Sequence, residues 1–401
     1  MHTSSQAPLA GVKVLELSQI MAGPTCGLML SDMGADVIKI EKYPYGDDAR
    51  GYAKAGDGAM APSFMMINRG KRSLAVDIRK PQGQAVVKRL VRGADIFTEN
   101  FRMGALEKQG LGYDTLKLEN SGLIYCSING YGRTGPLAAK GGFDLILQAY
   151  SGLISVTGEA GRKPVKTGNS VADMNAGIIA AFGILAAYIQ RLKTGQGTRV
   201  DTSLLQSSVH QMMWFAAAYF SQGHIAKPAG TAHPLIAPYE TYECADGSIA
   251  IGGANQPNWE RVANVLGHPE WITDERFIDG ATRLGNRQLL ADLMNTELKE
   301  KSVADWCAIL DEAGIPSGPV HNVQEALEHE QTKAVDMVID VDHPGGKKGR
   351  AIGAPLHMGG VSLANRNAPP RVGQHTREVM REFGFSDAET ATLLQEQAVF
   401  E

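Results

Sequence analysis

Asp173 is the residue of this chain with the clearest capacity for covalent chemistry. It lies just before an apolar stretch, residues 178–192, which predicts a long buried helix. A carboxylate at a helix N-terminus is stabilised by free backbone N–H groups and by the helix dipole. Such a carboxylate can act as a nucleophile towards an acyl group. Aspartate is also a preferred N-cap residue, so the local sequence alone favours a helix cap over catalysis.

A set of basic residues flanks the β-like runs of the first half of the chain. Lysine and arginine usually lie on the solvated surface. In a parallel sheet, however, several of these positions would gather at one rim. Cations at such a rim, beside exposed N–H groups, would hold phosphates or a pyrophosphate. The set comprises Lys42, Arg69, Lys71, Arg72, Arg102, Lys108 and Lys140, with Asn68 beside it.

These residues lie between elements that alternate along the chain. Helices are predicted at residues 25–33 and 81–92. Strands are predicted at residues 12–17, 36–41, 73–78, 95–100 and 123–128. Strands separated by such helices predict βαβ units, a mainly parallel sheet and an α/β fold. In such a sheet the ligand crevice lies beyond the carboxyl ends of the strands. Asn100, Phe101 and the loop at residues 130–132 fall at that edge.

From about residue 200 the pattern changes, which predicts a second, smaller α+β unit. Residues 200–220 predict a long helix, and residues 239–251 predict a hairpin. Further helices are predicted at residues 259–266, 286–299 and 303–313. We expect a large domain in residues 1–200, a linker helix and connector in 201–235, a small domain in 236–325, and a return to the large domain in 326–401.

Composition argues against several classes of protein. The net charge of −4 and the pI near 6.2 favour neither nucleic acid nor an anionic membrane surface as a partner. The 4 cysteines are far apart and form no CxxC, which argues against a disulfide framework and a zinc site and suits a reducing compartment. The chain begins without a signal-peptide pattern. It also lacks the ~18 uninterrupted apolar residues of a membrane span. We therefore expect a cytoplasmic protein without a metal site.

Common nucleotide and hydrolase motifs are missing from the sequence. The first strand–turn–helix lacks GxGxxG, and no GxxxxGK[ST], GxSxG or HExxH is present. Among the 10 histidines we single out only His233, in a connector rich in proline and glycine. A polar loop residue is the commoner role for such a histidine.

The ordered motifs of the chain resemble those of the class III CoA-transferases. This family includes formyl-CoA, carnitine-CoA and succinyl-CoA:glutarate transferases. The resemblance covers nearly the whole chain. Its motifs lie at residues 8–17, 22–24, 34–41, 71–73, 99–101, 130–132, 193–197 and 318–320, with Asp173 and Gly177 between them. The resemblance implies a Rossmann-like large domain built from both chain ends, a smaller middle domain, and a homodimer of two interlocked subunits.

The resemblance also implies a role for individual residues. Asp173 matches the nucleophilic aspartate of the family. Contacts with CoA fall at Ile20, Met21, Ala22, Lys42, Asn68, Lys71, Arg72, Asn100, Phe101, Lys108 and Lys140. Met21 is a departure, because the formyl-CoA branch has a glutamine there.

The implied mechanism passes through two activated intermediates. Asp173 would attack the acyl-CoA thioester to form a mixed anhydride, and the CoA thiolate would then form an aspartyl-CoA thioester. The acceptor carboxylate would reverse both steps. We expect the helix N-terminus to keep Asp173 ionised and nearby N–H groups to hold the oxyanion. CoA is a substrate here, so no tightly bound cofactor is expected.

Two other functions stay open at this point. The α-methylacyl-CoA racemases share the fold but have a catalytic histidine where this chain has Phe143, which cannot move a proton. A non-catalytic acyl-CoA-binding protein would use Asp173 only as a cap, which leaves the cation set unexplained.

The connector at residues 230–239 is similar to that of succinyl-CoA:glutarate transferases. We therefore expect a succinyl-CoA-like donor and a short dicarboxylate acceptor. Arg50 is a candidate clamp for the distal carboxylate, because guanidinium binds carboxylate bidentately, and a salt bridge is an equally good alternative. His233 is the second candidate for substrate contact.

Overall fold

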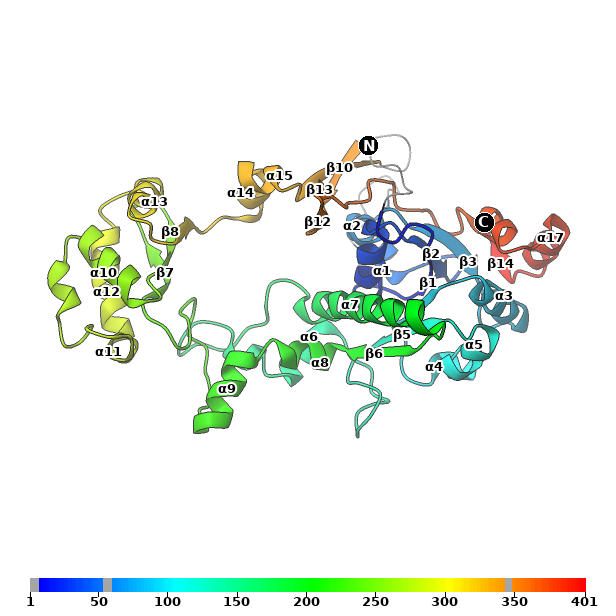
Figure 1. The fold of residues 1–401 in the computed structure, drawn as a ribbon, viewed down its shortest axis with the longest axis horizontal. Coiled ribbons are helices and arrows are strands. Elements are labelled where there is room, and N and C mark those ends of the chain that lie inside the picture. Colours follow the sequence, from blue (N-terminus) through cyan, green and yellow to red (C-terminus); the bar gives the residue numbers. More distant parts are fainter. Residues whose placement is uncertain (1–6, 53–59, 343–347) are drawn as a thin grey trace. The chain divides into compact units, whose positions relative to one another are not determined.

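The computed structural model describes residues 7–52, 60–342 and 348–401, which form two compact units (Figure 1). Unit 1 comprises Met1–Leu153, Thr167–Met213 and Glu330–Glu401, so it draws on both ends of the chain. Unit 2 comprises Ile154–Lys166 and Trp214–His329. These bounds differ from the predicted domains in that residues 201–213 belong to unit 1 and residues 154–166 belong to unit 2.

A seven-stranded sheet forms the centre of unit 1, in the order β14-β3-β2-β1-β4-β5-β6. The strands are β1 (Lys13–Leu17), β2 (Asp36–Glu41), β3 (Arg72–Val76), β4 (Ile96–Glu99), β5 (Ile124–Asn129), β6 (Arg199–Ser203) and β14 (Val399–Phe400). Only β14 runs antiparallel to its neighbour within this sheet. The predicted strands and the mainly parallel sheet are therefore confirmed.

Helices cover both faces of this sheet. The helices of unit 1 are α1 (Ala22–Asp32), α2 (Pro62–Asn68), α3 (Pro81–Arg92), α4 (Ala105–Lys108), α5 (Tyr113–Glu119), α6 (Asp144–Tyr150), α7 (Val171–Thr194), α8 (Leu204–His210), α15 (Glu330–Ala334), α16 (Thr376–Glu382) and α17 (Asp387–Gln395). Two small hairpins, β10 (Val338–Asp342) with β11 (Lys348–Ile352) and β12 (His357–Met358) with β13 (Val361–Ser362), complete the unit.

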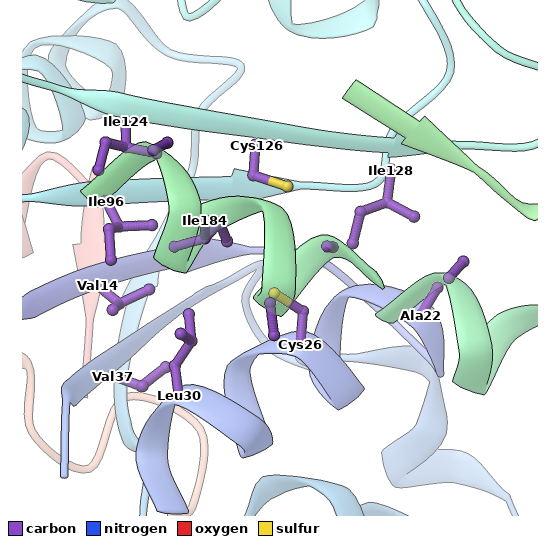
Figure 2. Packing of buried hydrophobic residues seen from close by; sticks show 14 of the residues in the cluster. Val14, Ala22, Cys26, Leu30, Val37, Ile96, Ile124, Cys126, Ile128 and Ile184 are labelled. Carbon is purple, nitrogen blue, oxygen red and sulfur yellow. The ribbon is translucent and has the colours of Figure 1, made fainter. Parts of the chain in front are cut away.

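Two hydrophobic cores hold these layers together, because successive strand residues point to opposite faces of the sheet. Val14, Cys126 and Ile184 belong to the core shared by α1 and α7 (Figure 2). Leu15 and Val87 belong to the core on the side of α3. Strands buried on both faces are rich in apolar residues, and most positions of β1 and β5 are buried.

Helix α7 lies close to α1 because Gly177 carries no side chain. A Cβ atom at Gly177 would lie 2.5 Å from the carbonyl oxygen of Ala22. Only one face of α7 is buried: Ala180 is inside, whereas Phe182 is 73% exposed. The predicted buried helix is therefore present, and within the single chain it is buried on one face. By length and composition α7 could cross a membrane, but its buried face belongs to the first core.

The predicted long helix at residues 200–220 is wrong. The structure has strand β6 there, followed by the separate helices α8 and α9 (Met213–Gln222). Strand β6 forms because it pairs with β5, with Thr202 opposite Ile128. Ser203 then starts α8 as its N-cap, since its side chain accepts a hydrogen bond from the N–H of Gln206.

Unit 2 is an α+β unit around an antiparallel sheet of β7 (Tyr239–Glu243), β8 (Ser248–Gly252) and β9 (Ser317–Pro319). Its helices are α10 (Gln256–Val265), α11 (Gly280–Gly285), α12 (Arg287–Leu298), α13 (Val303–Glu312) and α14 (Val323–Glu328). Trp259 and Phe277 are fully buried in its core. The predicted hairpin and the three predicted helices of this region are confirmed.

Candidate active site

A cavity of about 330 Å³ in unit 1 contains Asp173. Many of the residues predicted to contact CoA line it. They are Ile20, Met21, Ala22, Asn100, Phe101 and Lys140, joined by Gln19, Arg102 and Phe143. They come from the turn after β1, the end of β4 and the loop before α6. The structure thus brings together residues that are more than 150 positions apart in the sequence.

A second cavity of about 580 Å³ adjoins the first, since Gln19 and Phe101 line both. Its walls include Glu41 and Ile78, at and just beyond the ends of β2 and β3. This is the carboxyl edge of the parallel sheet, where ligand crevices of such folds lie. The cavity carries two exposed cations on its walls, Lys42 and Arg79.

Arg79 is a residue that sequence reasoning missed. It follows β3, whereas the predicted cations of this region, residues 68–72, precede or begin that strand. Which end of a strand a residue occupies decides whether it reaches the crevice. That rule alone could have selected Arg79 from the sequence.

Asp173 is the third residue of α7, so its predicted role as an N-cap is wrong. Asp144, the first residue of α6, takes the capping role instead. Its Oδ1 atom accepts hydrogen bonds from the N–H of Ala172 at 2.9 Å and of Asp173 at 3.4 Å. Its Oδ2 atom accepts a hydrogen bond from Gln148 at 2.7 Å. Because the backbone donors are bonded to Asp144, the Asp173 carboxylate is available for chemistry.

Asp173 is not held in the ionised form by the helix N-terminus. Burial and the neighbouring carboxylate of Asp144 together raise the pKa of Asp173 to about 7. Desolvation disfavours the charged form of a carboxyl group, and a nearby like charge acts in the same direction. At neutral pH both the protonated and the ionised form of Asp173 are therefore populated.

Lys71 and Arg72 do not gather with the other cations. The Lys71 ammonium is buried beneath α1, 2.7 Å from Glu16 Oε2, and donates to Asn68 Oδ1 at 2.9 Å. Burial lowers the pKa of Lys71 to about 8, although the charge of Glu16 opposes this shift. Arg72 begins β3 and is paired with three carboxylates, those of Asp36, Glu378 and Glu382. The prediction of one common rim is wrong for these two residues and Asn68, because they precede or begin β3.

Arg50 is bound within the protein instead of facing the Asp173 cavity. Its guanidinium donates to both carboxylate oxygens of Glu41, at 2.8 Å and 2.7 Å, and to the carbonyl of Pro370 at 3.0 Å. The salt-bridge alternative is therefore the one observed. The pKa of Glu41 is lowered, since the hydrogen bonds and charge of Arg50 outweigh the effect of burial.

Two further predicted residues lie outside both cavities. Lys108 is exposed at the end of α4. His233 belongs to unit 2, where its ring contacts Trp214 and Tyr239 with centroids 6.4 Å and 5.3 Å apart. Its Nδ1 atom accepts a hydrogen bond from the N–H of Leu235 at 3.2 Å. These contacts give His233 a structural role in its own unit.

Comparison with known protein families identifies the class to which this fold and site belong. Residues 9–376 match the model of CoA-transferase family III. The chain belongs to this family and is a CoA-transferase, which confirms the prediction made from the ordered motifs.

Individual relatives are similar over almost their whole length. An acyl-CoA transferase of Fusarium pseudograminearum is 37% identical over 99% of this chain and 89% of its own. The succinyl-CoA:glutarate CoA-transferase of Mus musculus is 35% identical over 94% of this chain and 87% of its own length. A crystal structure of a CaiB/BaiF family protein from Brucella suis is 37% identical, with a TM-score of 0.83 over 94% of this chain and 99% of its own.

Proposed function

We propose that Asp173 is the nucleophile that carries CoA between two carboxylic acids. Its carboxylate oxygen attacks the thioester carbon of the donor, the C–S bond breaks, and the thiolate leaves with the electron pair. The thiolate then attacks the aspartyl carbonyl carbon, which releases the donor acid and leaves an aspartyl-CoA thioester. The acceptor carboxylate reverses both steps, so atoms and charges balance without ATP.

One observation carries this proposal: a half-buried carboxylate lies in a cavity that adjoins a larger crevice, whose walls carry the exposed cations Lys42 and Arg79. We assign the phosphate groups of CoA to the Lys42 and Arg79 side of the crevice, because cations hold phosphates there. The thioester then lies past Phe101, near Lys140 and Asp173. Asn68, Lys71 and Arg72 are left out of this set because they line neither of the two cavities.

The proposed donor is succinyl-CoA and the proposed acceptor is a short dicarboxylate such as glutarate. The relatives named succinyl-CoA:glutarate CoA-transferase support this choice, at 34% to 35% identity over 94% of the chain. With Arg50 occupied by Glu41, the candidate for the distal carboxylate is Arg102. It lines the Asp173 cavity, and none of the residues that the structure describes forms an ion pair with it.

We also propose that the protein is a homodimer with interlocked subunits and that it acts in the cytoplasm. The exposed face of α7 supports the dimer: Ile178, Phe182, Ile189 and Leu192 are all large, apolar and exposed. Exposed apolar patches of this kind mark interfaces. Free cysteines throughout support a reducing compartment. The molar mass in solution by light scattering tests the dimer.

The function is tested with succinyl-CoA and glutarate, followed by mass spectrometry of the CoA products. Asp173→Ala should abolish transfer while CoA still binds by calorimetry. In the unchanged enzyme, borohydride should reduce the aspartyl-CoA thioester and alter the mass of the peptide that contains Asp173. An Asp173→Ala variant with normal turnover would refute the proposal.

Racemisation is the second candidate and is disfavoured by Phe143. This side chain lines the Asp173 cavity, and no histidine is among the described residues that do so. Incorporation of deuterium at the α-carbon of a 2-methylacyl-CoA in D₂O would restore the racemase assignment.

A further inference from the structure

Ile20 has a backbone conformation that its side chain disfavours. Its φ angle is +67°, in the left-handed region that β-branched residues rarely adopt. Ile20 lies in the turn between β1 and α1 and lines the Asp173 cavity. Such conformations persist only where the surrounding structure enforces them, and they concentrate at functional sites.

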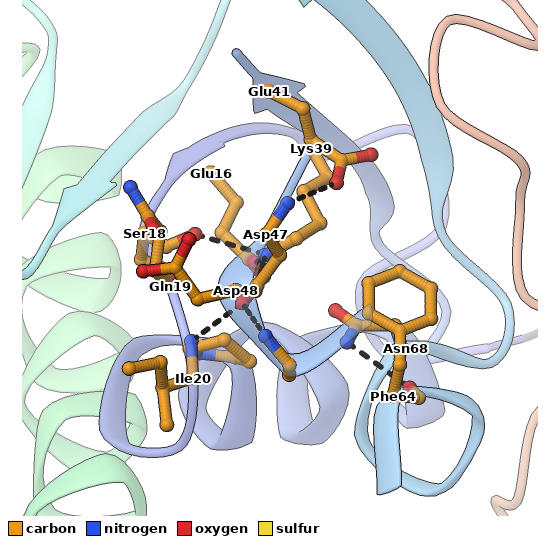
Figure 3. A network of polar contacts seen from close by, with 12 residues as sticks. Glu16, Ser18, Gln19, Ile20, Lys39, Glu41, Asp47, Asp48, Phe64 and Asn68 are labelled. Atoms are coloured by element: carbon orange, nitrogen blue, oxygen red, sulfur yellow. Dashed lines mark hydrogen bonds and ion pairs between the residues drawn. The ribbon is translucent and has the colours of Figure 1, made fainter. Parts of the chain in front are cut away.

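Two side chains enforce this turn. Asp47 Oδ1 accepts a hydrogen bond from the N–H of Ile20 at 2.9 Å (Figure 3). Asn100 holds the preceding residue, Gln19, through both its N–H at 2.9 Å and its carbonyl at 2.8 Å. The two contacts come from different segments, the loop after β2 and the end of β4. The turn is therefore fixed by tertiary structure on both sides.

Asp47 is itself fixed by buried charge. Lys39 Nζ lies 2.9 Å from Asp47 Oδ2 and 2.7 Å from Glu16 Oε1, and all three side chains are fully buried. Lys39 also donates to the carbonyl of Ser18 at 2.9 Å, two residues before Ile20. A buried carboxylate with a matched cation and several donors has few alternative positions.

The charge of Asp47 persists in this environment. Burial alone would raise the pKa of Asp47, but Lys39 and the N–H groups of Ala49 and Ile20 hold it below its usual value. Charged acceptors form stronger hydrogen bonds than neutral ones. The bond to Ile20 is therefore suited to oppose the strain of the left-handed turn.

We propose that Asp47 is a positioning residue for CoA transfer, acting through Ile20. It holds the 19–21 turn so that this wall of the cavity stays at a fixed place relative to Asp173. When the bond is lost, the turn relaxes to an ordinary conformation and the bound thioester no longer aligns with the carboxylate. Misplacement by about 1 Å can cost two orders of magnitude in rate. The inference rests on the proposed role of Asp173.

Two alanine variants separate positioning from general stability. Asp47→Ala removes the acceptor, and Asp32→Ala removes another buried carboxylate of unit 1, the partner of Arg69 outside both active-site cavities. Both variants should melt at lower temperature. Only Asp47→Ala should lower kcat, by about 10- to 100-fold, with the dissociation constant of CoA within about threefold of normal.

Rescue by glycine gives the decisive readout. Glycine adopts a positive φ without strain, so Ile20→Gly combined with Asp47→Ala should recover most of the lost kcat. Asp47→Asn retains a neutral oxygen acceptor for Ile20 but places its NH2 group beside the Lys39 ammonium, so its kcat should lie between that of the unchanged enzyme and that of Asp47→Ala. If Asp47→Ala does not fold, Asp47→Ala with Lys39→Met removes both partners and leaves Glu16 paired with Lys71.

Three results would overturn the inference: equal kcat in Asp47→Ala and Asp32→Ala, no recovery with Ile20→Gly, or loss of CoA binding without loss of kcat. A separate result tests the proposed role of Asp173 on which this inference rests. An active Asp173→Ala enzyme would reject the nucleophile, whatever the Asp47 variants do. An inactive Asp173→Ala with a fully active Asp47→Ala would reject only the positioning role.

Discussion

Asp144→Asn should shift the pH dependence of CoA transfer to lower pH. The proposed nucleophile, Asp173, must be ionised to react, and its pKa is raised to about 7 by burial and by the charge of Asp144. Asparagine keeps an oxygen that can accept the N–H of Ala172, so the start of α7 retains its cap. The change therefore removes a negative charge near Asp173 and keeps the cap of α7, at the cost of the hydrogen bond that Gln148 donates to Asp144 Oδ2.

The expected size follows from the ionised fraction of Asp173. With a pKa of about 7, about a tenth of the enzyme is ionised at pH 6. If the pKa falls by one pH unit, which corresponds to about 1.4 kcal/mol, about half is ionised at pH 6. The rate at pH 6 should then rise about fivefold relative to the rate at pH 8, where both enzymes are almost fully ionised.

The assay is kcat/KM for succinyl-CoA measured from pH 5 to pH 9 at constant ionic strength. Asp387→Asn is the matched control, because it removes a first-turn carboxylate from α17, outside both cavities. Its profile should coincide with that of the unchanged enzyme. If the acidic limb of the pH profile of Asp144→Asn coincides with that of the unchanged enzyme, the proposed coupling between the Asp144 and Asp173 carboxylates is refuted.

Two further predictions concern the cations of the site. Lys42→Ala and Arg79→Ala should each raise the KM for acyl-CoA by about two- to fivefold, with a smaller effect at high salt, because both side chains are exposed. The KM for a truncated pantetheine thioester, which lacks the nucleotide, should be the same in both variants and the unchanged enzyme. Arg102→Met should raise the KM for glutarate by about tenfold or more, since charged hydrogen bonds contribute about 1.5–3 kcal/mol. The KM for butyrate, which has no distal carboxylate, should not change in Arg102→Met. An equal rise of the KM for both acids would contradict a clamp at Arg102.

The pattern of apolar residues was sufficient to predict five of the seven strands of the sheet of unit 1. These strands are buried on both faces, so their sequences are rich in apolar residues and are bounded by turns. Pro81 marked the start of α3, because proline suits the first turn of a helix. Strand β6, at residues 199–203, was not predicted from this pattern. Strand β6 is only partly buried, and its pairing with β5 outweighs its weak local preference.

The sequence predicted those residues of the candidate site that directly follow a strand, because the carboxyl end of a parallel strand lies at the crevice. Asn100 and Phe101 follow β4, and Lys42 follows β2, so all three reach the carboxyl edge of the sheet. The same rule, applied to β3, would have preferred Arg79 over Arg72. A cation in the sequence carries no information about its partners, which is why the sequence left two roles open for Arg50 and placed Lys71 with the cations of the rim.

By itself, the sequence determined the α/β class, the family and the identity of the candidate nucleophile, because these depend on local pattern and on motif order. Only the tertiary structure decided the electrostatic state of Asp173, since burial and Asp144, 29 positions earlier, set its pKa. It also decided the binding partners of Arg50 and Asp47, because packing brings those partners near them. Charges and hydrogen bonds act through distance in space, and sequence separation does not report that distance.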